Sequence, residues 1–290
     1  MLCVACISSS PTVTHVIPQH NRGLEVTSLG DEVFVLHSKF PWQKIEVYDA
    51  KTFTFQRHIT VPGFGHRSLG LAACLYYNCL YASDYDNHSV HRVELSGNNA
   101  ATKWSVARPA GLSVNSEHNL LVVSQAGSKL QIFTTDGTLL QNIQLQADIE
   151  HPGPRHAVQL PSGQFLVCYE GALQRVCLVG VDGAVVRSYG GQKGSQLTQL
   201  SRPVCLSVDR EGRVLVADWL NNRLLVIDQS LSSAHEMSVC VDGGLKGPWS
   251  LWYDQSRRRL YVGEWTLWAS GRVIVIDNMK DFSAVYVNAK

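Results

Sequence analysis

The feature that most constrains the fold is a short segment that recurs six times along the chain. It occurs as GLEV, GLAA, GLSV, AVQL, CLSV and SLWY, and the second residues of these segments are Leu24, Leu71, Leu112, Val158, Leu206 and Leu251. The intervals between them are 47, 41, 46, 48 and 45 residues. Self-similarity with this period is typical of a repeat architecture, so we expect six structural units.

Each unit contains four apolar segments separated by polar turns. In the third unit these segments cover residues 111–114, 120–124, 130–133 and 139–145. Their apolar residues alternate or run in short blocks, which indicates strands, and turns such as 134–138, 181–184 and 209–212 supply Gly for hairpins. Six units of four antiparallel strands predict an all-β fold, a six-bladed β-propeller.

We expect one domain, over residues 12–290, after an N-terminal tail of residues 1–11. A propeller ring closes when a strand from one terminus completes a blade at the other. Two segments have the required pattern, TVTHVI at 12–17 and FSAVYV at 282–287. We favour closure by the N-terminal strand, because an incomplete last blade would leave a pairing edge open.

The composition limits the class of protein. The chain has 290 residues, a hydrophobic fraction of 45% and a net charge of +1, which fits a folded domain and gives no overall charge for binding DNA. No apolar run reaches the length of a membrane span, and MLCVACISSS lacks the features of a signal peptide. We therefore expect a cytoplasmic protein, monomeric as an isolated domain, with no membrane partner.

The cysteines predict buried thiols and no metal centre. Five of the eight lie in apolar, strand-like segments: Cys74, Cys168, Cys177, Cys205 and Cys240. Cys3 and Cys6 form a single CxxC without a second pair of ligands nearby, so we predict no zinc site.

The fifth unit carries a more specific motif. Its sequence from Arg202 to Asp228, RPVCLSVDREGRVLVADWLNNRLLVID, resembles an NHL repeat, in which a Pro-containing start, an Asp after the second strand and an Asn-x-Arg follow in order. The third unit is similar, with Gln125 at the Asp position. The resemblance implies an NHL propeller like the substrate-recognition domain of tripartite-motif ubiquitin ligases. The RING, B-box and coiled coil of that family are not in this sequence.

The Asp of the motif belongs to a column of polar residues, one in each unit. The column consists of Ser38, Asp84, Gln125, Glu170, Asp218 and Glu264. We interpret these as turn residues, each bonded to its own loop, rather than as a cation-binding ring. Asn221 or Asn222 is expected in the left-handed conformation that the turn after Asp218 requires.

One face of the propeller collects the candidate binding residues. The loops between blades and the loops from second to third strands share this face, and before each apolar segment stands a cation: Arg22, Arg67, Arg108, Arg155, Arg202 and Lys246. Aromatic residues accompany them: Trp42, Tyr85, Trp219, Trp249, Trp265 and Trp268. Arginines beside aromatic rings suit a protein interface or single-stranded RNA. The alternative is that each Arg pairs with a turn carboxylate of a neighbouring blade.

Two long loops, 38–44 and 264–271, are expected to lie side by side in the closed ring. Their aromatic residues, Phe40, Trp42, Trp265 and Trp268, would form an exposed apolar patch. The opposite face has one basic run, Arg257 to Arg259, which we interpret as solvated.

Catalysis is not expected. His66, His151 and His156 lie near the starts of blades, but the sequence contains no GxSxG, HExxH or phosphate-binding loop, and no cofactor is predicted. We predict a non-catalytic scaffold that binds a protein or peptide on one face. The alternatives are binding of single-stranded or hairpin RNA through the Arg and aromatic face, and a metal-dependent propeller hydrolase or lyase.

Overall fold

The structure is a computed structural model of the chain. It describes residues 11–18, 24–37, 44–65, 67–97, 99–147, 153–266 and 271–279. Within these ranges the only helical element is η1 (Trp219–Asn221), a single 3₁₀ turn, and no helix is long and apolar enough to span a membrane.

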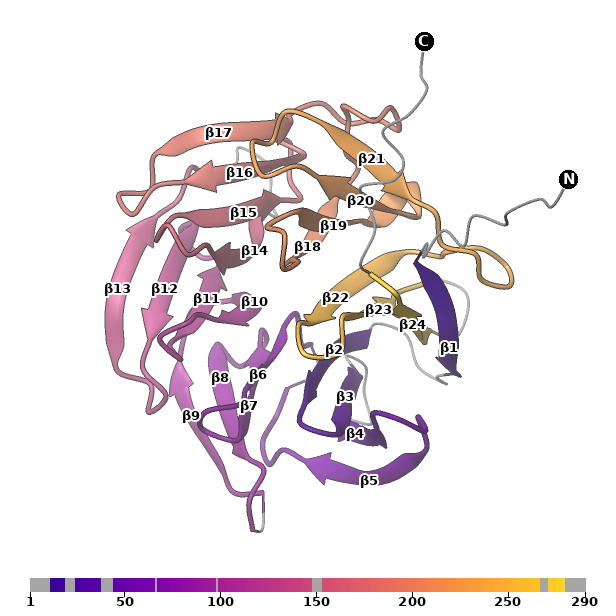
Figure 1. The fold of residues 1–290 in the computed structure, drawn as a ribbon. Coiled ribbons are helices and arrows are strands. Elements are labelled where there is room, and N and C mark those ends of the chain that lie inside the picture. Colours follow the sequence, from indigo (N-terminus) through magenta and orange to yellow (C-terminus); the bar gives the residue numbers. More distant parts are fainter. Residues whose placement is uncertain are drawn as a thin grey trace, which may run out of the picture.

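Six four-stranded antiparallel sheets are arranged around a central axis (Figure 1). Blades 1 to 3 consist of β2(Leu24–Leu29), β3(Glu32–His37), β4(Lys44–Asp49) and β5(Phe55–Thr60); β6(Leu71–Cys74), β7(Cys79–Asp84), β8(Ser89–Glu94) and β9(Ala101–Ser105); and β10(Pro109–Val114), β11(Leu120–Ser124), β12(Lys129–Phe133) and β13(Leu139–Gln144). Blades 4 and 5 consist of β14(Pro154–Gln159), β15(Phe165–Tyr169), β16(Arg175–Val179) and β17(Val185–Gly190); and β18(Pro203–Val208), β19(Val214–Asp218), β20(Arg223–Ile227) and β21(Ala234–Met237). The predicted six-bladed all-β propeller is confirmed.

The sixth blade combines both ends of the chain. It contains β22(Pro248–Asp254), β23(Arg259–Glu264) and β24(Arg272–Asp277), and its outermost strand is β1(Thr12–Pro18). β1 pairs antiparallel with β24 from Thr12 opposite Asp277 to Pro18 opposite Arg272. The N-terminal strand thus occupies the position that closes the ring, and the other candidate, 282–287, lies outside the described residues.

The innermost strand of each blade packs against the innermost strands of the adjacent blades. Apolar side chains fill the spaces between neighbouring blades; Phe34 and Leu36 of blade 1, for example, share a cluster with Leu80 of blade 2. Glycine permits a close approach of blades 3 and 4, since a Cβ on Gly111 would lie 2.5 Å from the imidazole of His156. The packed ring therefore sets where the strands of each blade end and where the loops begin at its two faces.

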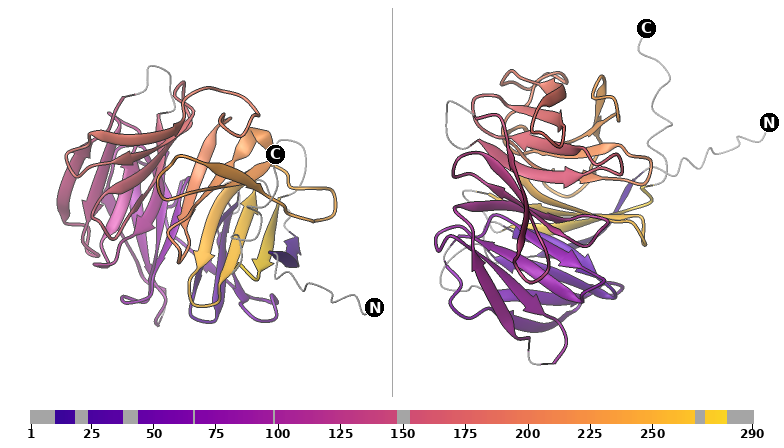
Figure 2. Two further views of the ribbon diagram at one scale, coloured as in Figure 1. Left: turned by 45° about the horizontal axis from the view of Figure 1, so that its top comes forward. Right: turned by 90° about the vertical axis from the view of Figure 1, so that its left-hand side faces the viewer.

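The two faces carry different connections, seen edge-on in Figure 2. We call one the connection face: it holds the loops between blades, such as 61–70 and 190–202, and those from second to third strands, such as 85–88 and 219–222. We call the other the hairpin face: it holds the turns from first to second and from third to fourth strands.

The predicted burial of the five cysteines is confirmed with one exception. Cys74, Cys168, Cys177 and Cys205 are buried free thiols, as is Cys79. Cys240 is exposed, so its predicted burial is wrong. The reason is that β21 ends at Met237, and Cys240 lies in the loop that leads to blade 6.

Candidate functional site

The connection face is built on buried carboxylates that hold its loops. Asp84, Asp218 and Glu264 each accept a hydrogen bond at 2.7 Å from the backbone N–H of the loop that precedes their own blade, at Gly65, Ser201 and Lys246 respectively. All three side chains are buried. The column is structural at these three positions, as predicted, but these bonds reach the loop before the blade; Asp84 and Asp218 also accept from Asn87 and Asn221 of their own turns, as expected.

A side chain from the third strand completes each of these sites. Asp84 lies 3.2 Å from His91, Asp218 lies 2.8 Å from Arg223, and Glu264 lies 2.7 Å from Arg272. Burial raises the pKa of Asp218, and the hydrogen bonds from Asn221, Ser201 and Arg223 oppose that shift.

Blade 2 repeats the blade 5 motif, which we did not identify from the sequence of the second unit. The amide Nδ2 of Asn87 donates to Asp84 at 3.0 Å, as that of Asn221 donates to Asp218 at 2.7 Å. The signal was available in the common Asp-x-x-Asn spacing. It was missed because Ser89 stands at the position of Arg223, and His91, two residues further along the third strand, makes the contact with the aspartate.

The remaining members of the column behave differently. Gln125 donates to the carboxylate of Glu170 and to the carbonyl of Pro154, both at 3.4 Å, so these two residues connect blades 3 and 4 instead of bonding their own loops. Ser38 lies outside the described residues. Within the described part of the chain, no cluster of three His, Cys, Asp or Glu side chains could hold a metal ion.

The structure corrects the register of the predicted cation ring. In blades 3 to 6 the first strand begins with a proline that pairs with the residue at the end of the second strand. These prolines mark structurally equivalent positions in the four blades: Pro109, Pro154, Pro203 and Pro248. The residues before them are Arg108, Gly153, Arg202 and Gly247. Arg155 and Lys246 therefore stand one residue after and two residues before the proline, because glycine occupies the shared position in their blades.

Arg155 projects into the central channel and is 2% exposed. Its Nη1 donates to the carbonyl of Leu69 at 2.6 Å. Its Nη2 lies 3.8 Å from the carboxylate of Glu25, and its Nε lies 3.7 Å from that of Glu170. Its guanidinium carbon lies 5.0 Å from the ring centre of Trp249. One side chain thus connects blades 1, 2, 4 and 6. Arg155 is therefore a buried side chain near two carboxylates, but these are Glu170 of its own blade and Glu25 of strand β2, not a turn carboxylate of a neighbouring blade as the alternative expected.

Two other arginines stack on aromatic rings of the connection face. The guanidinium of Arg67 lies 4.6 Å from the ring centre of Tyr85, and that of Arg202 lies 5.2 Å from Trp219. Tyr85 and Trp219 each follow the buried aspartate of their blade. The same Arg-on-aromatic pair therefore occurs in blades 2 and 5.

Three tryptophans gather between blades 5 and 6. The ring centre of Trp219 is 5.3 Å from that of Trp249 and 4.8 Å from that of Trp265, and Trp249 and Trp265 are 5.4 Å apart. The indole N–H of Trp249 donates to Glu25 at 2.8 Å. Trp219 is buried, whereas Trp249 and Trp265 are partly exposed, so this cluster forms part of the surface.

Four cations at the surface of this face lack an acidic partner in the described part of the chain. Among the described residues, no carboxylate lies within ion-pair distance of Arg67, Arg108, Arg202 or Lys246. The deeper Arg223 and Arg272 are both paired. The predicted residues Arg22, Trp42 and Trp268, together with Phe40, lie outside the described ranges.

The opposite face corrects a smaller prediction. Arg257 and Arg259, expected to be solvated, are half-buried and paired: Arg257 lies 2.7 Å from Asp31 and 3.0 Å from Asp254, and Arg259 lies 2.5 Å from Asp277. These contacts connect the first turn of blade 6 to blade 1 and to β24.

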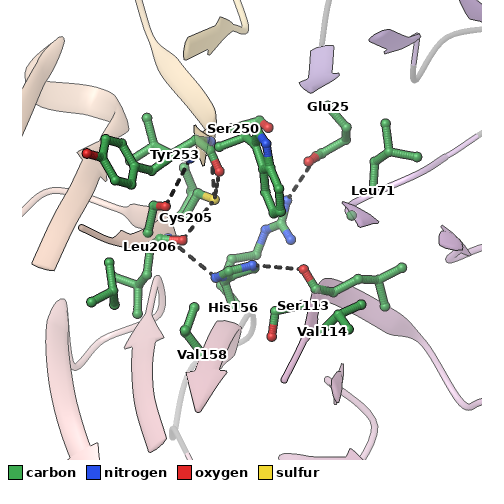
Figure 3. Close-up of a pocket in the computed structure, with 18 of the residues that line it drawn as sticks. Glu25, Leu71, Ser113, Val114, His156, Val158, Cys205, Leu206, Ser250 and Tyr253 are labelled. Carbon is green, nitrogen blue, oxygen red and sulfur yellow. Dashed lines mark hydrogen bonds and ion pairs between the residues drawn. The ribbon is translucent and has the colours of Figure 1, made fainter. Parts of the chain in front are cut away.

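The central channel contains a cavity of about 320 Å³. Its lining runs from Glu25, Arg155 and Trp249 near the connection face to Pro161 and Gln255 in hairpin turns. Figure 3 shows His156, Ser113, Cys205 and Ser250 around it. Apolar side chains such as Leu71 and Val158 complete the wall.

His156 has a structural position in this wall. Its Nε2–H donates to the carbonyl of Leu112 at 3.0 Å, and its Nδ1 accepts from the N–H of Leu206 at 3.4 Å. Burial lowers the pKa of His156 to about 4. Neutral His156 thus bridges blades 3, 4 and 5 with both ring nitrogens; His66 and His151 lie outside the described residues.

Comparisons with known proteins agree with this architecture. No family model matches the sequence. Protein brain tumor of Drosophila melanogaster is 24% identical over 132 residues, which make up 44% of this chain and 12% of that protein. The chain therefore spans only a small part of that relative.

Solved structures share the fold at low sequence identity. A protein of unknown function from Bacteroides thetaiotaomicron has a TM-score of 0.71 with 15% identity, covering 93% of this chain and 74% of that one. Virginiamycin B lyase from Staphylococcus aureus, solved with quinupristin, has a TM-score of 0.63 with 11% identity, covering 91% and 88%. Together with the blade 5 motif, these matches identify the chain as a six-bladed β-propeller that resembles NHL-repeat domains.

Proposed function

We propose that this propeller is a non-catalytic recognition scaffold that binds a protein or peptide on its connection face. The observation that carries the proposal is the surface made by Arg67, Arg108, Arg202 and Lys246 around Tyr85 and the three-tryptophan cluster. Tyr, Trp and Arg are the residue types that contribute most to protein interfaces. Since these cations have no carboxylate partner among the described residues, the ligand is expected to carry Asp or Glu.

The packing of the aromatic rings favours a peptide over RNA. Single-stranded RNA binds aromatic platforms by stacking its bases on open ring faces. Here Arg67 lies over Tyr85, Arg202 over Trp219 and Arg155 over Trp249, while Trp265 packs against both other tryptophans. A base would have to displace one of these contacts, whereas acidic side chains can bind the outer edges of the stacked guanidinium groups.

A lyase-like or hydrolase-like function has less support. Streptogramin B lyase shares the fold, with a TM-score of 0.59 and 13% identity, and a fold supports many functions. The described histidine of the channel wall, His156, uses both ring nitrogens to bridge blades. A ubiquitin-ligase role, as the family resemblance implies, would have this propeller select the substrate while another segment or partner supplies catalysis.

The proposal is tested with a triple variant, Arg67→Ala, Arg108→Ala and Arg202→Ala. Purified wild-type and variant proteins are compared in crosslinking to cellular partners followed by mass spectrometry, and in binding to a randomised single-stranded RNA pool at low and physiological salt. We expect the wild type to recover a defined set of proteins with acidic segments and the variant to lose them. The control is Lys51→Ala, Arg210→Ala and Arg258→Ala on the hairpin face.

Two outcomes contradict the proposal. If partner recovery is the same for the triple variant and the wild type, the connection face is not the binding surface. If sequence-enriched RNA binding survives physiological salt and depends on the three arginines, the ligand is RNA. The exposed or half-buried positions of these arginines predict unchanged thermal stability, which separates lost binding from lost folding.

A further inference from the structure

The hairpin face carries an apolar turn that the fold does not require. The turn from β6 to β7 is Leu75-Tyr76-Tyr77-Asn78, and Leu75, Tyr76 and Tyr77 are 73%, 68% and 38% exposed. The equivalent turns of the other five blades are polar at their tips: Gly30-Asp31, 115–119, 161–163, 209–212 and 255–258. These five turns show that the connection between the first and second strands of a blade does not need apolar residues.

The backbone of the turn is satisfied without these three side chains. Asn78 adopts the left-handed conformation with a φ of 47°, and its N–H donates to the carbonyl of Leu75 at 3.3 Å. Leu75, at 73% exposed, contributes little buried area. A contiguous exposed apolar group that adds little to folding is typical of an interaction site.

The tyrosines form a ridge that extends to blade 3. The ring of Tyr76 stacks on His118 of the neighbouring turn, with centres 4.3 Å apart and an interplanar angle of 5°. Tyr77 stands nearly perpendicular to Tyr76, at 4.8 Å and 87°. The stacking restricts the ring of Tyr76, so the binding of a partner would cost little side-chain conformational entropy at this residue.

Next to the ridge lies a groove of about 440 Å³ between blades 6, 1 and 2. Leu75 forms one wall, Leu29 and Ala73 contribute apolar surface, and Trp252 stands on the far side with its indole N–H bonded to Ser28 at 2.8 Å. The groove is large enough to take one leucine or aromatic side chain. The ridge and the groove share Leu75 and therefore form one surface.

The charges around this surface specify the partner further. Inside the groove, Arg257 is paired with both Asp31 and Asp254. Beside the ridge, Glu117 is exposed and has no cationic partner among the described residues. Among the described hairpin turns, Asp31 and Glu211 are paired with Arg257 and Arg213, whereas the exposed carboxylates Glu117, Asp136 and Asp182 have no ion-pair partner among the described residues; the exposed cations of these turns are Lys51 and Arg210. The complementary ligand is cationic.

We propose that the Leu75–Tyr77 ridge and its adjoining groove form a second docking site, which binds an extended peptide segment carrying a leucine or aromatic anchor flanked by Lys or Arg. The anchor enters the groove beside Leu75. A flanking cation lies over the open face of Tyr76 or near Glu117, where cation–π and ion-pair contacts are available. The peptide differs in charge from the acidic ligand of the connection face, and the two sites lie on opposite faces. One propeller can therefore hold both partners at once.

The test uses a displayed library of random 12-residue peptides, selected on the wild-type protein. Selected peptides are then measured against the turn variant, Leu75→Ser, Tyr76→Ser and Tyr77→Ser, and against Tyr76→Ser alone. The matched control is Leu139→Ser, Leu140→Ser and Val181→Ser, which removes comparably exposed apolar side chains near other hairpin turns of the same face. All variants are checked for an unchanged unfolding midpoint.

We expect enriched peptides to combine Leu, Phe, Tyr or Trp with Lys or Arg, and to bind the turn variant at least about tenfold more weakly than the control. Glu117→Gln is expected to weaken them by about threefold at low salt. The connection-face triple variant should bind them normally, which keeps this result independent of the proposed function. The proposal is overturned if no peptide distinguishes the turn variant from the control, or if the distinguishing peptides lack basic residues.

Discussion

The carboxylate of Asp218 is expected to be among the most important side chains for the stability of blade 5. It is fully buried and accepts three hydrogen bonds, from Ser201 N–H at 2.7 Å, Asn221 Nδ2 at 2.7 Å and Arg223 Nε at 2.8 Å. In an Asp218→Ala variant, all three donors lose this acceptor. The guanidinium of Arg223, which is 6% exposed, is left as a buried charge without its counterion.

The magnitude follows from how firmly Arg223 is held. Its Nη atoms donate to the carbonyls of Ser195 at 2.7 Å, Gln196 at 3.0 Å and Gln199 at 2.7 Å, so the side chain cannot swing into water without breaking these bonds. Removing one partner of such a buried pair typically costs about 3–5 kcal/mol. We expect Asp218→Ala to lower the free energy of unfolding by this amount.

Equilibrium unfolding in guanidinium chloride measures the effect. The matched control is Asp182→Ala in an exposed hairpin turn, which loses one bond to Ala184 N–H and should cost well under about 1 kcal/mol. In an Asp218→Ala, Arg223→Met double variant, the buried charge is absent and part of the stability should return. A loss below about 1 kcal/mol for Asp218→Ala would refute the reasoning, because the carboxylate would then not hold the loop.

Three further predictions concern the channel and the closure of the ring. His156 has a folded-state pKa of about 4, below its ordinary value of 6.5; its neutral form contributes stability fully above pH 6.5, and up to about 3 kcal/mol of this is lost as the pH falls to 4. The free energy of unfolding of wild type minus that of His156→Gln should fall over this range, and a constant difference would contradict the assignment. Gly111→Ala should destabilise the protein by about 1–3 kcal/mol in thermal or denaturant unfolding, because its Cβ would lie 2.6 Å from the carbonyl of Arg155; an unchanged midpoint would show that the blades can separate. Deleting residues 1–18 removes β1 and leaves β24 as an open edge, so light scattering should detect association, and a monodisperse monomer would argue against the need for closure.

The sequence predicted the architecture because the repeat carries it. Alternating apolar strands recur in every unit and Gly-containing hairpin turns in blades 1 to 5, and the left-handed residue of the blade 5 turn, predicted to be Asn221 or Asn222, is Asn222, with a φ of 52°. Local residue types were sufficient here, since each turn is specified by its own sequence.

The register of the connection face could not be predicted by counting from the apolar segments. The first strands of blades 3 to 6 each contain a shift in pairing just after their proline, for example between Pro109 and Leu112, so equal counts do not reach equivalent positions. The prolines themselves are visible in the sequence and give the correct register. What no pattern revealed is the inward direction of Arg155, because that depends on Leu69 and Glu25 in other blades.

The shared sixth blade has a consequence for how the chain folds. Blades 1 to 5 are each made of consecutive strands, so their pairing needs only short loops to close. The bond from Thr14 to Asp277 joins residues 263 positions apart and cannot form until nearly the whole chain has been synthesised. Closure of the ring therefore requires a search between two segments that are far apart in the sequence, and each of its contacts adds more to the contact order than a contact within one of blades 1 to 5.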